Sequence, residues 1–198
     1  MMNDVVNKIK FQVKLGPVTF AIIVVCVVVW IVELIGGTKF ISAGIYSPIW
    51  ATEQPYRYIT SLFMHDGFLH ILLNMYALYS CGKIVERLLG TKNFLLVYFA
   101  SGIAGNLFLT VFCYIVRNFS LFACGASGAI FGLFGALIIL YKNLGQNAGP
   151  LIINVGIIVL LGVFMSEVAW QAHVGGLVSG LTATYCVVRK GNTRVWWW

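Results

Sequence analysis

Charged side chains are scarce in this sequence. Only 10% of its 198 residues are Asp, Glu, Lys or Arg, whereas soluble domains contain about 25%. Hydrophobic residues make up 60% of the chain. This balance excludes an ordinary soluble domain and predicts an integral membrane protein whose surroundings are the lipid bilayer.

Acidic residues are especially few, which excludes two kinds of hydrolytic site. The only aspartates are Asp4 and Asp66, so a pair of intramembrane aspartates cannot form. The zinc protease pattern H-E-x-x-H is absent from the sequence. No metal-ligand spacing links the five cysteines, and we expect free thiols at Cys26, Cys81, Cys113, Cys124 and Cys186. We therefore expect neither a metal nor another cofactor.

The apolar residues fall into six long runs. Each is close to the roughly 17–25 residues that cross about 30 Å of hydrocarbon, and the second and fifth are the shortest. The runs are residues 18–36, 68–82, 94–116, 121–141, 150–165 and 168–188. They predict an all-α fold, a polytopic bundle of six transmembrane helices over residues 18–188, with an N-terminal segment 1–17 and a C-terminal tail 189–198.

Basic residues are distributed unequally between the two sides of the predicted membrane. Lys39, Arg57 and Arg117 lie on one side. The others lie on the opposite side: Lys8, Lys10, Lys14, Lys83, Arg87, Lys92, Lys142, Arg189, Lys190 and Arg194. Because basic residues favour the cytoplasmic side, we expect both termini in the cytoplasm. This pattern explains the net charge of +7 without nucleic acid, and the compact chain suggests a prokaryotic inner membrane.

Small residues recur at every fourth position in two of the runs. The fourth run has Gly128, Gly132 and Ala136, and the sixth has Ala172, Gly176 and Gly180. Such faces let two helix backbones approach closely. Packing alone is therefore a sufficient explanation for Ser127, taken by itself beside Gly128.

Three polar residues on different predicted helices reach a similar shallow depth below the outer surface. At 1.5 Å per residue, His70 lies about 9 Å down its helix and His173 about 7 Å. Ser127 lies at about 9 Å if residues 121–126 are helical. Ionisable groups at such depths usually face the bundle interior or a water-filled cavity. Each histidine alone could be structural, but the shared depth predicts one site.

Ser127 and His173 suit the roles of nucleophile and base. His173 shares a helix face with Gly176 and Gly180. If the two small-residue faces pack, its ring comes within the roughly 2.6–3.2 Å of the Ser127 hydroxyl that base activation requires. Ser127 follows the helix breaker Gly125, so we expect it in the first helical turn, where free backbone N–H groups can stabilise an oxyanion.

His70 and Asn74 are four residues apart and point in the same direction on the second helix. Both could donate hydrogen bonds to the oxygen of a tetrahedral intermediate. The alternative for Asn74 is an interhelical hydrogen bond, worth about 1 kcal/mol. Neither Glu33 nor Glu167 is well placed to complete a triad, so we predict a Ser–His dyad.

These motifs resemble those of the rhomboid intramembrane serine proteases between about Tyr56 and Gly180. The matching pieces are GASG at 125–128, AHVGG at 172–176 and HDGFLHILLN at 65–74, which contains the paired histidines His65 and His70. The resemblance implies the six-helix core of that family, Ser127 as the nucleophile and His173 as the general base and acid. It further implies an oxyanion hole formed by His70, Asn74 and the backbone N–H of Ser127, with Gly125 shaping the preceding turn.

Three supporting positions depart from the family pattern. Tyr56 and Arg57 resemble its Trp-Arg pair, with Tyr in place of Trp. The ERLLG segment, 86–90, resembles its acidic–basic turn, although the basic residue directly follows Glu86. Phe131 stands where the family often has a Tyr that stacks on the catalytic histidine. The stacking face is retained here without its hydroxyl.

The implied activity is hydrolysis of peptide bonds in transmembrane segments near the outer surface of the bilayer. Single-pass substrates with small residues at the scissile bond would pass the short fifth helix, and Phe164 and Met165 are candidate lid residues. The first alternative is a non-cleaving relative, which we expect to lack the serine or histidine. The second is a small transporter or channel, which requires polar groups through the full thickness of the membrane. No sequence feature indicates an oligomeric state.

Overall fold

The helical prediction is confirmed by the computed structural model, which describes residues 16–165 and 168–191. Two short helices, η1 (Pro48–Trp50) and α3 (Arg57–Thr60), lie between the first two long ones. The longer, apolar helices are α2 (Pro17–Gly44), α4 (Phe68–Leu89), α5 (Thr91–Val116), α6 (Ser127–Asn143), α7 (Gly149–Val163) and α8 (Trp170–Arg189). Within the described ranges there is no β-strand, only an isolated bridge between Tyr46 and Ala123. The chain is an all-α, multi-pass membrane protein.

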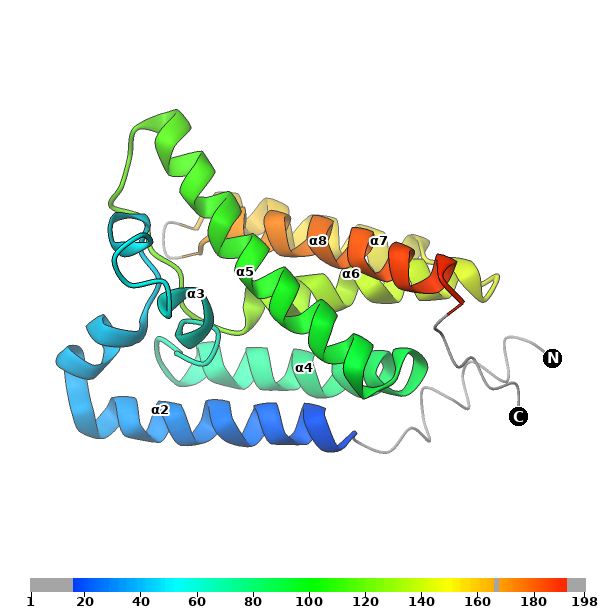
Figure 1. Cartoon of the computed structure of the whole chain (residues 1–198), viewed down its shortest axis with the longest axis horizontal. Helices are drawn as coiled ribbons and strands as arrows, with labels where there is room; N and C mark the ends of the chain where they lie inside the picture. Colours follow the sequence, from blue (N-terminus) through cyan, green and yellow to red (C-terminus); the bar gives the residue numbers. More distant parts are fainter. Residues whose placement is uncertain (1–15, 166–167, 192–198) are drawn as a thin grey trace.

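The long helices are arranged around α6 (Figure 1). α2 packs along α4, and α5 crosses the bundle diagonally. α6 contacts α4, α5, α7 and α8, with the most extensive packing against α8. The first turn of α2 and the last turn of α8 lie at the same end of the molecule (Figure 1), as an even number of crossings requires.

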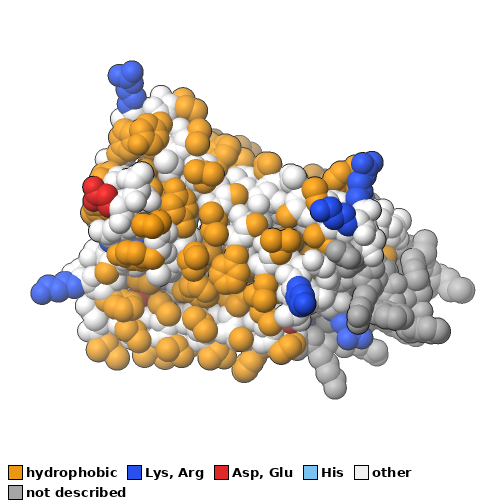
Figure 2. Space-filling model, viewed as in Figure 1, with side chains coloured by type: hydrophobic (Ala, Val, Ile, Leu, Met, Phe, Trp, Pro, Cys, Tyr) orange, Lys and Arg blue, Asp and Glu red, His pale blue; other side chains and the backbone are white. Residues whose placement is uncertain are grey.

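The outer surface of the bundle suits a lipid environment. α2, α4 and α5 are long and apolar enough to cross a membrane, while α6 and α7 are shorter apolar helices. Figure 2 shows hydrophobic side chains over the faces of the helices, with Lys and Arg side chains gathered towards the two ends. This distribution keeps charges near the water and apolar groups in the hydrocarbon.

The fourth helix begins at Ser127, in agreement with the first-turn position expected after Gly125, and not at the start of the apolar run at 121. Residues 121–126 are not helical: the amides of Tyr46 and Ala123 each donate to the other's carbonyl at 2.9 Å, and the amide of Gly125 donates to the Ser61 carbonyl at 2.8 Å. Gly125 has φ +110°, a conformation that glycine adopts readily, and α6 then starts at Ser127. The depth calculated for Ser127 with a helical leader is therefore wrong.

The connection between the first two long helices contains more helix than the apolar runs predict. α2 continues beyond a non-helical Gly37 with φ 60° and ends only at Gly44. Arg57 holds the following turns together, because its Nη1 donates to the carbonyls of Ser42 (2.6 Å) and Ile45 (2.8 Å). Its guanidinium carbon also lies 4.6 Å from the centre of the Trp50 ring. The connection is thus an ordered structure tied to the bundle.

α6 and α8 meet along a glycine seam, formed by Gly128, Gly132, Gly176 and Gly180. A Cβ atom at Gly176 would overlap the carbonyl oxygen of Gly128, and one at Gly180 would overlap that of Gly132. The two backbones are therefore in direct contact, as the four-residue spacing predicts. This contact brings the N-terminal turns of α6 and α8 side by side.

Candidate active site

The Ser127 hydroxyl and the His173 imidazole meet where α6 and α8 begin. Nε2 of His173 lies 2.9 Å from Oγ of Ser127, and His173 is 8% exposed. With the ring proton on Nδ1, Nε2 accepts a hydrogen bond from the hydroxyl. This is the geometry that a base requires to activate an alcohol nucleophile.

Phe131 fixes the plane of the His173 ring. The two rings are stacked, with their centroids 4.2 Å apart and their planes 8° from parallel. Nδ1 of His173 is buried without a hydrogen-bond partner among the described residues. Glu167, which the sequence did not favour as a third member, lies outside the described residues. The Ser–His dyad stays a prediction.

His70 lies against the turn that leads to Ser127. A Cβ atom at Gly125 would come within 2.8 Å of Nε2 of His70, so the ring occupies space that any other residue at position 125 would need. On its opposite edge, Nδ1 of His70 accepts a hydrogen bond from the amide of Asp66 at 3.3 Å. A neutral ring that accepts at Nδ1 carries its proton on Nε2, which places a donor beside Gly125.

Asn74 is buried on the same helix as His70, but its side chain is turned to its own backbone. Nδ2 donates to the carbonyl of His70 at 2.9 Å, and Oδ1 is buried without a partner in the part of the chain that is described. Nδ2 has a second hydrogen available for another acceptor. The oxyanion role of Asn74 stays a prediction.

Two buried carboxylates join α2 to the α4 region. Glu86 of α4 accepts from the amides of Val18 (3.1 Å) and Thr19 (2.8 Å), and from the Thr19 hydroxyl (2.7 Å). Further along α2, the two carboxylate oxygens of Glu33 accept from the amide of His65, which precedes α4, at 3.1 and 3.2 Å. Sequence reasoning missed this contact of Glu33, because a backbone N–H leaves no signature in the residue pattern.

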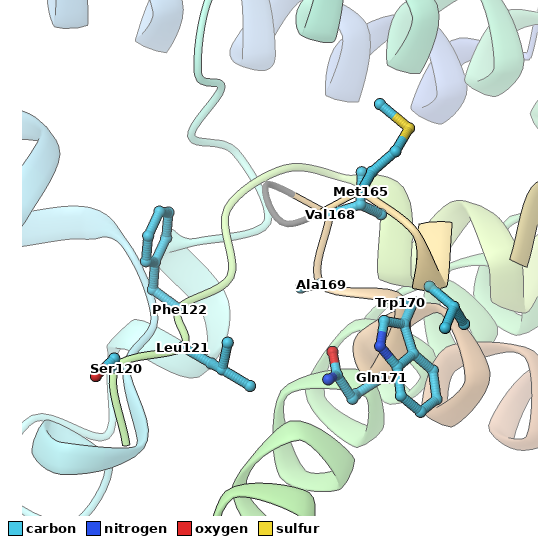
Figure 3. A pocket seen from close by; sticks show the side chains of 9 residues that line it. Ser120, Leu121, Phe122, Met165, Val168, Ala169, Trp170 and Gln171 are labelled. Atoms are coloured by element: carbon cyan, nitrogen blue, oxygen red, sulfur yellow. The ribbon is translucent and has the colours of Figure 1, made fainter. Parts of the chain in front are cut away.

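A cavity of about 210 Å³ opens beside the start of α8. Figure 3 shows Leu121 and Phe122, from the segment before α6, on one side, and Trp170 and Gln171 on the other. The amides of Ala172 and His173 both donate to the carbonyl of Ala169, in the wall of the cavity, at 2.9 and 3.4 Å. The cavity wall and the His173 position therefore belong to one hydrogen-bonded turn.

Comparisons with known proteins converge on one family. The Rhomboid domain model matches residues 52–190. A Bacillus subtilis (strain 168) protein named "Putative rhomboid protease YdcA" is 36% identical over 149 residues, covering 73% of this chain and 73% of the relative. Rhomboid protease GluP of the same organism is 35% identical, covering 67% of this chain and 26% of the relative. Rhomboid protease GlpG of Salmonella paratyphi A is 27% identical, covering 91% of this chain and 67% of the relative.

Proposed function

The chain belongs to the rhomboid family of intramembrane serine proteases, and from this premise we propose that it cleaves transmembrane segments of other proteins with a Ser127–His173 dyad. The observation that carries this assignment is the 2.9 Å separation of Ser127 Oγ and His173 Nε2. The ring stacking of Phe131 on His173 supports it, because a base must keep its orientation through both halves of the reaction.

The reaction proceeds through an acyl-enzyme. His173 takes the hydroxyl proton as Ser127 Oγ attacks the substrate carbonyl, and then gives that proton to the leaving amine as the C–N bond breaks. The same histidine next takes a proton from water as it attacks the ester, and returns that proton to Ser127 Oγ as the C–O bond breaks and the new carboxyl group leaves. No cofactor takes part in these steps.

The oxyanion is stabilised by hydrogen-bond donors around the start of α6. The backbone N–H of Ser127 lies in the first turn, where helical N–H groups have no partner within the helix. Nε2 of His70 lies beside Gly125, and Asn74 contributes its second amide hydrogen after a side-chain rotation. Gly125 supplies the sharp turn, and the glycine seam holds this arrangement against α8.

The substrate segment reaches Ser127 near the outer surface. Its helix must unwind locally, because helical carbonyls are held in backbone hydrogen bonds. The cavity beside Trp170 accommodates a substrate side chain next to the scissile bond, with Phe164 and Met165 as a lid and the α7 side as the lateral path. Both termini are on the cytoplasmic side of a prokaryotic inner membrane, and residues 18–188 form the protease domain between segments 1–17 and 189–198.

An activity-based fluorophosphonate tests the dyad directly. We expect the purified wild type to be labelled and to cleave a reporter transmembrane substrate, and Ser127→Ala and His173→Ala to lose both activities by at least about 1,000-fold. Ser101→Ala is the matched control, because Ser101 is buried on α5 and its hydroxyl has no hydrogen-bond partner among the described residues. Labelling that persists in Ser127→Ala contradicts the assignment. A wild type that binds transmembrane segments without labelling or cleavage supports a non-cleaving role instead.

A further inference from the structure

Glu33 is a carboxylate buried in α2, a long apolar helix. It is 3% exposed, lies four residues before the non-helical Gly37 of α2, and is not used by the proposed mechanism. Ionisable groups inside a membrane are costly and are usually retained for a specific interaction. The contacts of Glu33 show what that interaction is.

The carboxylate of Glu33 holds the turn that precedes α4. Its two oxygens lie 3.1 and 3.2 Å from the backbone nitrogen of His65. The turn continues through Asp66 to Gly67, which has φ +88°, and α4 begins at Phe68. The position of the 65–67 turn is therefore tied to α2 through one side chain.

The next amide in this turn controls the His70 ring. The N–H of Asp66 donates to Nδ1 of His70 at 3.3 Å, and this bond requires the neutral ring to carry its proton on Nε2. Nε2 is the atom that lies beside Gly125. The peptide amides of positions 65 and 66 are consecutive, so a shift of the first displaces the second.

We propose that Glu33 is a positioning residue for the oxyanion hole. By holding the amide of His65, it keeps the Asp66 N–H on Nδ1 of His70, and so keeps the Nε2–H of His70 directed towards the turn before Ser127. This inference rests on the proposed function, in which His70 is an oxyanion donor. Glu33 itself does not contact the substrate.

A pair of substitutions of similar size tests the hydrogen-bond acceptor. Glu33→Met fills the same volume in an apolar helix but accepts no hydrogen bond, whereas Glu33→Gln keeps an acceptor oxygen. Removing an oxyanion donor lowers kcat by about 100- to 1,000-fold. A donor that remains but points in the wrong direction should cause a smaller fall in kcat. We expect kcat to fall about tenfold in Glu33→Met with KM unchanged, and to remain within about twofold of wild type in Glu33→Gln.

Thr19→Val is the matched control for general loosening of the α2–α4 pair. It removes the hydroxyl that donates to Glu86 at 2.7 Å, at the opposite end of the same helix pair. We expect Thr19→Val to lower the melting temperature without changing kcat at temperatures well below unfolding. If Glu33→Met and Thr19→Val lose kcat equally, or if Glu33→Met keeps full kcat, the positioning role is wrong.

A double-mutant comparison identifies the residue through which Glu33 acts. In a His70→Ala background, Glu33→Met should have no further effect on kcat, whereas in an Asn74→Ala background its tenfold effect should persist. A full tenfold effect without His70 overturns the inference. The proposed function fails separately, through hydrolysis that persists in Ser127→Ala; Ser127-dependent hydrolysis that is insensitive to Glu33→Met refutes only the role of Glu33.

Discussion

The α6–α8 pair and the α2–α4 pair are held together in opposite ways. α6 and α8 touch backbone to backbone, with Gly176 against the Gly128 carbonyl and Gly180 against that of Gly132. α2 makes its main helix contact with α4. Two buried carboxylates join α2 to α4 and to the turn before it, because each accepts a backbone N–H group from the other element. The first pair carries both members of the proposed dyad, and the second carries the proposed oxyanion donors His70 and Asn74, both on α4.

This difference determines how each pair responds to substitution. No side chain can give way where two backbones touch, so an added methyl group at the glycine seam must separate the helices. A side-chain hydrogen bond can be weakened in steps, because the acceptor can be changed while the helices stay packed. A substitution in the glycine seam should therefore remove most of the activity at once. Substitutions of the carboxylates should lower stability and rate in smaller steps.

The largest effect is expected from Gly176→Ala in the glycine seam. The new Cβ overlaps the Gly128 carbonyl oxygen, and a shift of about 1 Å between Ser127 and His173 is enough for a 100-fold loss. We expect cleavage of a reporter transmembrane substrate to fall at least about 100-fold. Gly156→Ala in α7 is the control, because its Cβ has no neighbour within 4 Å; it should retain activity and gain up to about 1 kcal/mol of helix stability.

Equal activity in these two alanine variants would contradict this role of the seam. Circular dichroism of both variants then distinguishes a displaced helix from an unfolded protein. Retained helix content with lost activity in Gly176→Ala is the expected result.

The next effect is on stability, from Glu86→Ala where the first turn of α2 meets the last turns of α4. This change leaves the buried amide and hydroxyl of Thr19 without their acceptor, at about 1–3 kcal/mol for each unsatisfied group. We expect a clear fall in the melting temperature, measured in detergent, with kcat within about threefold of wild type well below unfolding. The control Glu53→Ala removes an exposed carboxylate of the connection between α2 and α4 and should change stability by less than about 0.5 kcal/mol. A large loss of kcat in folded Glu86→Ala would show that this end also positions the site.

The features that the sequence predicted are those with a regular spacing. Apolar runs indicated the long helices, and the four-residue spacing of Gly176 and Gly180 indicated a face that packs closely. Both patterns follow from helix geometry alone. The approach of His173 to Ser127 could then be anticipated, because both residues adjoin the seam.

The features that the sequence missed depend on non-helical backbone. Residues 121–124 belong to the apolar run of α6, yet Ala123 pairs with Tyr46 in an extended conformation. Hydrophobicity cannot distinguish such a segment from a helical turn. Glu33 was considered only as a partner for a catalytic histidine, whereas its observed partner is a peptide N–H, which every residue except proline provides.

The smallest effect is expected at Phe131, where a ring contact rather than a backbone contact orients the base. Phe131→Leu removes the face stacked on His173, and aromatic pairs contribute about 0.5–1.5 kcal/mol, so kcat should fall by roughly two- to tenfold. Phe131→Tyr keeps that face and should stay within about threefold of wild type. Phe134→Leu is the control, because Phe134 packs edge-on against Phe131. If Phe134→Leu reduces kcat as much as Phe131→Leu, packing around position 131, and not the stacked ring, orients His173.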